Sequence, residues 1–95
     1  MIPVSFEVLG VELVRGGRVQ ALANVSIEIA GVGFTVQGCR VIRTRSGGLT
    51  VEGPAFKHPD GHTWPAVVLP SELRDAIGAE VLCEVAALPS HARRA

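Results

Sequence analysis

The chain has 95 residues, and its nine basic residues balance nine acidic ones to a formal net charge of zero. This length is most economically one domain spanning residues 1–95, and the zero charge excludes a whole-molecule field that would attract nucleic acid or an anionic membrane. Any electrostatic function must therefore come from charged residues that cluster locally. Almost half of the residues are apolar and only 4% are aromatic, so we expect a thin core of Val, Leu, Ile and Ala, which favours oligomerisation.

The first residues, MIPVSFEVL, lack the basic region and long apolar run of a signal peptide, and no apolar stretch approaches the ~18 residues that span a bilayer. We therefore expect a soluble, cytoplasmic protein with no membrane partner. The two cysteines, Cys39 and Cys83, lie far apart without a metal-binding spacing. We predict that both are small buried hydrophobic residues rather than a disulfide pair.

Alternation of apolar and polar residues predicts the first strand. Its apolar residues share one parity from Val4 to Val8 and the other parity from Val11 to Leu13. A bulge at Gly10, where the parity changes, would keep both sets on the inner face.

The next segment, from Val19 to Ile29, alternates with a period of two that only Leu22 breaks. This pattern predicts a half-buried strand with one wet face. Residues 15–18, Arg-Gly-Gly-Arg, are suited to a tight turn with positive φ, so the first two strands are predicted to form a hairpin.

Two more glycine turns, at residues 30–33 and 45–48, predict a second hairpin and a fourth strand at 49–52. Residues 53–65 are rich in Gly and Pro and contain a Pro-Asp-Gly turn, which indicates a protruding loop or a loose hairpin. Residues 66–69, Ala-Val-Val-Leu, are expected to return as a fifth strand.

A helix is predicted from Glu72 to about Ala87, with Ser71 as its N-cap. Gly78 costs about 1 kcal/mol in a helix interior and could split it, which leaves a strand from Glu80 to Val85 as the alternative. Residues 90–95 are expected to be a flexible tail. The apolar residues at helical spacing are Leu73, Ile77, Val81, Val85 and Leu88.

The predicted fold class is therefore α+β, an antiparallel β-meander of four or five strands with a C-terminal helix packed on or beside the sheet.

The residue types of a metal or catalytic site are present without a convincing pattern. His58, Asp60 and His62 surround the Pro-Asp-Gly turn, where Asp60 already has the structural role of bonding its own backbone, so we predict no metal and no cofactor. Ser46 and Cys39 could serve as nucleophiles, but no motif accompanies them. We therefore predict no enzymatic activity and no small-molecule substrate.

The segment 40–62 is locally basic, since it contains only two acidic residues. Arg43 and Arg45 are expected on one face of a strand, and such a stripe is what a phosphate backbone requires. The alternative is that the arginines keep a half-exposed sheet face soluble and protect its edge. The candidate nucleic-acid-binding residues are Arg40, Arg43, Arg45 and Lys57.

Phe56 and Trp64 flank the Pro-Asp-Gly turn, and either could stack on an unpaired base. Each could instead pack beneath the loop as a satellite of the core, an interpretation that we favour for Trp64. A third class of function is a plain interaction module, because exposed strand edges favour a homodimer that extends the sheet.

The stretch FTVQGCRVIRTRSGGLTVEGPAFKHPDG resembles the SpoVG family of small bacterial proteins. The shared pattern is an aromatic-x-valine pair, a basic residue before Val-Ile, a glycine turn, a hydrophobic residue two before a valine, a proline, basic residues and Pro-Asp-Gly. The resemblance extends over about residues 6–86. The residues that carry it are Phe34, Val36, Arg40, Val41, Ile42, Gly48, Leu49, Val51, Pro54, Lys57, Pro59, Asp60 and Gly61.

This resemblance implies a homodimer with an antiparallel sheet and a C-terminal helix, which binds DNA or RNA and affects septation, sporulation and gene expression. It also implies that Arg40 and Lys57 take the basic positions of the family. The chain departs from the pattern where Ala55-Phe56-Lys57 stands in place of the usual Ser-Lys-Arg, so one basic residue is missing.

We therefore expect a dimeric nucleic-acid-binding regulator that contacts the DNA or RNA backbone through a basic strand and loop. The alternative is a non-catalytic protein-interaction or structural homodimer without nucleic-acid binding.

Overall fold

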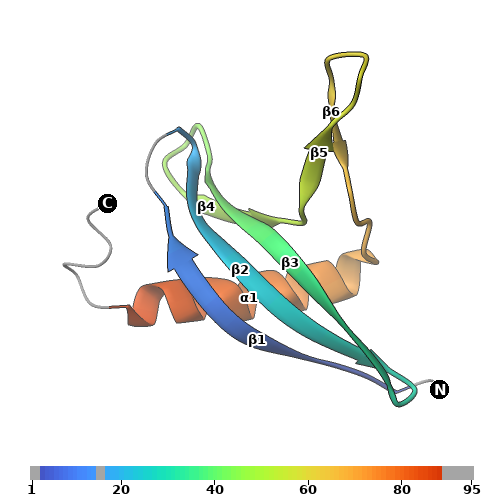
Figure 1. Cartoon of the computed structure of the whole chain (residues 1–95). Coiled ribbons are helices and arrows are strands. Elements are labelled where there is room, and N and C mark those ends of the chain that lie inside the picture. Colours follow the sequence, from blue (N-terminus) through green and yellow to red (C-terminus); the bar gives the residue numbers. More distant parts are fainter. Residues whose placement is uncertain (1–2, 15–16, 89–95) are drawn as a thin grey trace.

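The computed structural model describes residues 3–14 and 17–88. The main sheet has four antiparallel strands in the order β1-β2-β3-β4, a second sheet pairs β5 with β6, and one helix, α1, lies across the main sheet (Figure 1). The predicted α+β class, the meander and the C-terminal helix are confirmed. The elements are β1 (Val4–Leu13), β2 (Val19–Ile29), β3 (Val32–Arg43), β4 (Leu49–Glu52), β5 (Ala55–Lys57), β6 (Thr63–Pro65) and α1 (Ser71–Ala87).

The predicted hairpin of the first two strands is confirmed, with the bulge where the parity changes. Val8 pairs with Val25 and Gly10 pairs with Asn24, so Leu9 is the extra residue of β1. Part of the turn predicted at residues 15–18 and the whole tail predicted at 90–95 lie outside the described residues.

The turn between β2 and β3 consists of Ala30 and Gly31. Their φ values are 51° and 83°, and positive φ at both central residues is the signature of a type I′ turn. This turn type matches the twist of the flanking strands and brings Ile29 opposite Val32.

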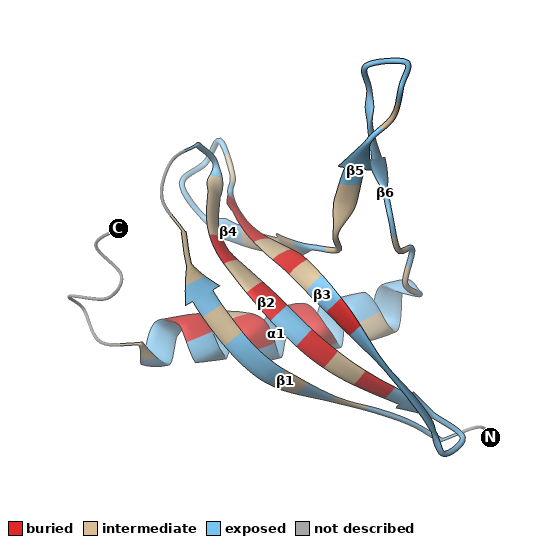
Figure 2. Ribbon diagram, in the orientation of Figure 1, coloured by how far each residue is buried: buried red, intermediate tan, exposed pale blue. Residues whose placement is uncertain are grey.

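The core lies between one face of the main sheet and α1 (Figure 2). Burial raises the pKa of the Cys39 thiol, which lies in this core as predicted. The same prediction was wrong for Cys83, because this residue lies on an exposed side of α1. The buried residues of the cluster are Ala21, Ala23, Val25, Ile27, Val36, Cys39, Val41, Ile77, Val81 and Val85.

The helix continues through Gly78, so the alternative of a strand from Glu80 to Val85 is excluded. Gly78 is buried and packs closest to Val51 of β4. The predicted N-cap was wrong by one residue. Pro70 occupies the cap position without a side-chain hydrogen bond to the helix, and Ser71 is the first helical residue.

The fifth strand predicted at residues 66–69 was wrong, because the chain returns as β6, at Thr63–Pro65. Val67 and Leu69 are partly buried against the core, whereas Val68 is 81% exposed. Residues 66–69 therefore form a loop that packs on the core without ladder hydrogen bonds.

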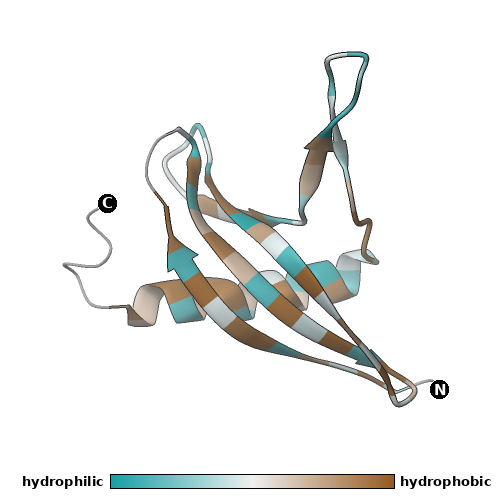
Figure 3. Ribbon diagram, in the orientation of Figure 1, coloured by the Kyte–Doolittle hydropathy of each residue, from teal (hydrophilic) through white to brown (hydrophobic). Residues whose placement is uncertain are grey.

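The far end of the β2–β3 hairpin extends beyond the helix and is both apolar and exposed (Figures 2 and 3). Here Phe34 pairs with Ile27 of the core, and Ile29 pairs with Val4 and with Val32, so these side chains continue the inner face of the sheet. We call Val4, Ile29, Val32 and Phe34 the apolar tip; their exposed fractions are 50%, 38%, 69% and 45%.

Among the described residues, no helix combines the length and the apolar character needed to cross a lipid bilayer.

Candidate nucleic-acid interface

Residues 55–65 form a hairpin, here called the arm, that stands away from the main sheet (Figure 1). Of the two structures predicted for residues 53–65, the hairpin is the one observed. At its base, the Ala66 N–H donates to the Pro54 carbonyl at 2.9 Å. At its turn, the His58 N–H donates to the His62 carbonyl at 2.8 Å, and the Gly61 N–H donates to the His58 carbonyl at 2.9 Å.

The Asp60 carboxylate organises this turn. Its Oδ1 accepts the His62 N–H at 2.8 Å and lies 3.2 Å from His58 Nδ1 and 3.3 Å from His62 Nδ1. The hydrogen bond from the His62 backbone, followed by those from neighbouring side chains, lowers the pKa of Asp60. No group of three or more His, Cys, Asp or Glu residues in the described chain is arranged to hold a metal ion.

Phe56 and Trp64 lie on the same face of the arm, because they are directly paired across β5 and β6. Their exposed fractions are 48% and 47%, and neither belongs to the core cluster. The interpretation of Trp64 as a satellite of the core was therefore wrong. Its ring instead contacts that of His58, with the ring centroids 5.2 Å apart.

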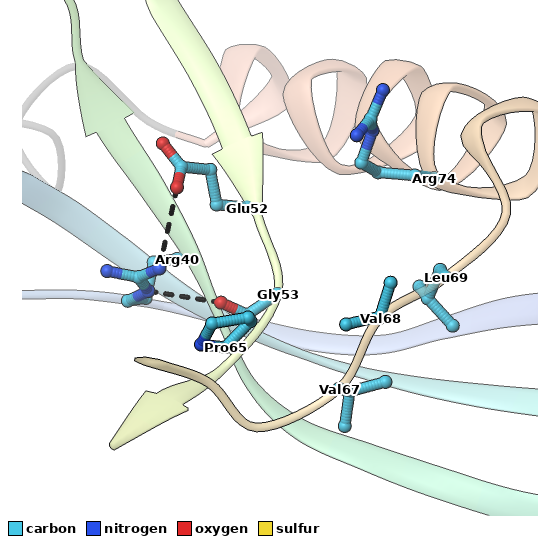
Figure 4. Close-up of a pocket in the computed structure, with 8 residues that line it drawn as sticks. All are labelled: Arg40, Glu52, Gly53, Pro65, Val67, Val68, Leu69 and Arg74. Atoms are coloured by element: carbon cyan, nitrogen blue, oxygen red, sulfur yellow. Dashed lines mark hydrogen bonds and ion pairs between the residues drawn. The ribbon is translucent and has the colours of Figure 1, made fainter. Parts of the chain in front are cut away.

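Arg40 of β3 connects the main sheet to the base of the arm (Figure 4). Its Nε donates to the Gly53 carbonyl at 3.1 Å, and its guanidinium lies 3.5 Å from the Glu52 carboxylate. Only 27% of the Arg40 side chain is exposed. The positive charge of Arg40 is thus matched within the protein, and its contacts hold the end of β4 against β3.

A pocket of about 270 Å³ lies beside this contact, between the base of the arm and the start of α1 (Figure 4). Arg40 and Glu52 line one side of it, and Val67 and Val68 come from the loop that leads to the helix. Arg74 of α1 also lines the pocket, and its Nε lies 3.5 Å from the Asp75 carboxylate. Both arginines of the pocket therefore already contact an acidic side chain.

Arg43 and Arg45 do not share a strand face, contrary to the prediction, because β3 ends at Arg43 and Arg45 lies in the following turn. Both residues are exposed. Arg43 donates from its guanidinium to the Gln20 side-chain oxygen at 3.3 Å, a neutral partner that leaves its charge unmatched.

Arg18 is a basic residue of this region that the sequence reasoning missed. Its Nε donates to the Arg43 carbonyl at 3.4 Å, and the Arg43 N–H donates to the Arg18 carbonyl at 2.9 Å. The pairing of β2 with β3 brings the two residues together. The sequence signal for this was the predicted hairpin, which makes the far ends of its two strands neighbours. We call Arg18, Arg43 and Arg45 the sheet-end cluster.

The sheet-end cluster and the arm lie on either side of β4 (Figure 1). The arm contributes Lys57, which is exposed at the end of β5. The four predicted basic residues therefore do not form one stripe. They divide into a cluster at the end of the sheet, a lysine on the arm, and Arg40 between them in a structural contact.

No protein-family model matches this chain, and no curated protein matches its sequence.

Proposed function

We propose that this protein is a homodimeric, cytoplasmic nucleic-acid-binding regulator of the SpoVG type. The observation that carries the proposal is the sheet-end cluster, where three exposed arginines gather in a molecule of zero net charge. Among the described residues, none of the three forms an ion pair with a carboxylate, whereas Arg40 and Arg74 each do. Unmatched guanidinium groups are the donors that bind phosphate oxygens and fix a nucleic-acid backbone.

In this proposal the sheet-end cluster and Lys57 contact phosphates, and Arg40 acts as a positioning residue for the arm. Few phosphate contacts imply weak, salt-dependent binding. Each contact contributes about 0.9 to the slope of log affinity against log salt for a duplex and about 0.7 for a single strand. The proposed role requires no catalytic group, cofactor or small-molecule substrate.

Arg18 and Arg45 both neighbour Arg43: Arg18 bonds its backbone across the β2–β3 ladder, and Arg45 follows it by two residues in the turn. Replacing either residue by Ala should weaken binding of DNA or RNA at low salt and should reduce the magnitude of the salt slope by roughly 0.7–0.9, because one phosphate contact is lost. Fluorescence anisotropy of labelled oligonucleotides across a salt series measures both quantities.

The matched control is Arg74→Ala, which removes the same charge from a residue that already contacts Asp75. This variant should bind as the wild type does. If Arg18→Ala and Arg45→Ala leave the affinity and the slope unchanged, or if the wild type binds no nucleic acid at low salt, the proposal is wrong.

The second candidate is the non-catalytic homodimer without nucleic-acid binding, and the apolar tip favours it. Four large hydrophobic side chains are exposed together on the inner face of the sheet, and the outer edge of β1 has no strand partner in the described chain. Exposed apolar patches and open strand edges are both features through which protein chains associate. This surface is separate from the sheet-end cluster, so self-association and nucleic-acid binding are compatible.

A further inference from the structure

The arm presents two large aromatic side chains to solvent in a fixed arrangement. Phe56 and Trp64 are directly opposite one another in the β5–β6 ladder, and side chains in such pairs have Cβ atoms about 4.5–5.5 Å apart on one face of the sheet. His58, two residues after Phe56, lies on this face as well, and its ring contacts that of Trp64. The three rings form what we call the aromatic face of the arm.

This arrangement is held from both ends. At the base, the arm is closed by the hydrogen bond from the Ala66 N–H to the Pro54 carbonyl. The hydrogen bond from Arg40 to the Gly53 carbonyl joins this base to β3. At the turn, Asp60 binds the backbone of His62. A two-stranded hairpin alone is marginally stable in water, so these anchors keep the aromatic face ordered before any ligand binds.

We propose that the arm selects unpaired nucleotides, whose bases stack on the aromatic face. This inference rests on the proposed nucleic-acid-binding function and names its substrate class, single-stranded DNA or RNA. Stacking needs a base whose flat face is free, and every base has such a face when it is unpaired and unstacked. Within a duplex, neighbouring base pairs cover these faces.

The chemistry of the arm disfavours the main alternative, in which a two-stranded ribbon enters the major groove of a duplex. Groove readers bond guanine chiefly through Arg or Lys and adenine through Asn or Gln, and residues 55–65 contain no Arg, Asn or Gln. Lys57 is the one permanent cation of the arm, and strand alternation puts it on the face opposite Phe56.

The charges of the arm also suit a polyanion. Asp60 is its one acidic residue, and this carboxylate is already bound by the His62 backbone and faced by two imidazoles. Lys57, with a long flexible side chain, can reach the edge of the narrow arm and bind a phosphate while bases occupy the aromatic face. The sheet-end cluster binds the continuing backbone on the far side of β4.

Trp64 makes the inference directly testable, because it is the only tryptophan of the chain and the chain has no tyrosine. The full-length protein is titrated at low salt with oligothymidylate, with oligouridylate and with a duplex of the same length. The two single strands should quench Trp64 fluorescence and bind at least tenfold more tightly than the duplex.

Variants then locate the contact by anisotropy of labelled oligonucleotides. Phe56→Ala and Trp64→Ala should each weaken single-strand binding by about 5- to 150-fold, the range measured for loss of one stacking side chain, with little effect on the duplex. Trp64→Phe retains a ring and should bind within a fewfold of the wild type, which separates stacking from folding defects. Val68→Ala is the matched control, since Val68 is apolar and 81% exposed but lies outside the arm.

The other outcomes overturn the inference in distinguishable ways. Equal binding of duplex and single strands without quenching, or preferential binding of duplex, would show that the arm does not select unpaired bases, while the proposed function would stand. Binding of neither form would reject both. If Phe56→Ala instead disrupts self-association of the protein without nucleic acid, the aromatic face is a contact between copies of the chain.

Discussion

At the scale of single residues, basic side chains of one type have different roles because their neighbours differ. Arg40 is mostly surrounded by protein, contacts Glu52 and donates to the Gly53 carbonyl. Arg43, three residues later, is exposed, and its guanidinium donates to the neutral amide of Gln20. A buried or matched guanidinium stabilises the protein around it, whereas an exposed and unmatched one is available to a phosphate. Sequence spacing alone does not separate these two environments.

Ala30 is strained, because it adopts φ of 51° in a region that L-residues with a Cβ atom disfavour. Asn followed by Gly is the preferred pair for a type I′ turn, so Ala30→Asn should stabilise the protein by about 1 kcal/mol. Urea denaturation followed by circular dichroism measures the difference. Ala30→Val, with a β-branched side chain, should shift the midpoint in the opposite direction; equal midpoints for the two variants would contradict the strained conformation.

We expect Asp60 to make the arm sensitive to acid. Its folded-state pKa is lowered below the ordinary value of 3.8, chiefly by the His62 N–H. A depressed carboxyl pKa adds stability above pH 3.8, and this stability is lost as the pH falls through the folded-state pKa. The arm turn should therefore loosen below about pH 4, visible as a change in Trp64 fluorescence.

Asp60→Asn is the matched variant for this pH dependence, since the amide oxygen still accepts the His62 N–H but does not titrate. It should remove the transition below pH 4. A transition of the same size in Asp60→Asn would assign the acid sensitivity to another group.

At the scale of elements, α1 shows how packing overrides local propensity. Gly78 weakens a helix by about 1 kcal/mol relative to Ala, yet the helix is continuous because Ile77, Val81 and Val85 are buried on the sheet. A strand in this region would have lost that apolar stripe. The helical spacing of the apolar residues was therefore a better guide than the single glycine.

Gly78→Ala should stabilise the protein by about 0.5–1 kcal/mol. A Cβ atom at this position would lie 3.6 Å from the Val51 side chain, which is an ordinary van der Waals contact. Thermal denaturation should show a melting temperature a few degrees higher than that of the wild type.

Gly53→Ala is the contrasting variant. The added Cβ atom would lie 3.3 Å from the Val67 carbonyl oxygen, so this substitution should destabilise the protein. A lower melting temperature for Gly78→Ala would indicate that helix and sheet are packed too closely for a methyl group.

At the scale of the whole molecule, one helix covers only part of the sheet. The helix packs on β1, β2 and β4, while the apolar tip continues beyond it. We expect this tip to be covered by a second copy of the chain, because α1, the one helix of the described residues, leaves it exposed and large exposed apolar patches favour association.

Val32→Asp tests this expectation, since Val32 is the most exposed residue of the tip at 69% and its replacement leaves the core intact. The wild type should have the mass of a dimer in light scattering at micromolar concentration, and the variant should have the mass of a monomer. The control Thr35→Asp adds the same charge to the outer face of β3 and should remain a dimer. A monomeric wild type, or a dimeric Val32→Asp, would argue against the apolar tip as the interface.

The order and kind of the main elements were predictable from residue patterns, because the period of two in the strands and the spacing of the helix stripe follow from which side chains must be buried. The sequence also located a bulge beside Gly10, where Leu9 is the extra residue, and identified residues 53–65 as a protruding segment. It did not identify β6, because the apolar residues 66–69 were predicted as the returning strand, whereas Val67 and Leu69 only pack on the core.

Long-range contacts determine which basic residues lack a carboxylate partner and which aromatic residues are exposed. Arg18 and Arg43 are 25 residues apart in sequence and meet through strand pairing, whereas Arg40 is held by Glu52 and Gly53. Trp64 is exposed because the arm stands away from the sheet. Charge matching and exposure depend on contacts between segments far apart in the chain, and local residue patterns do not contain that information.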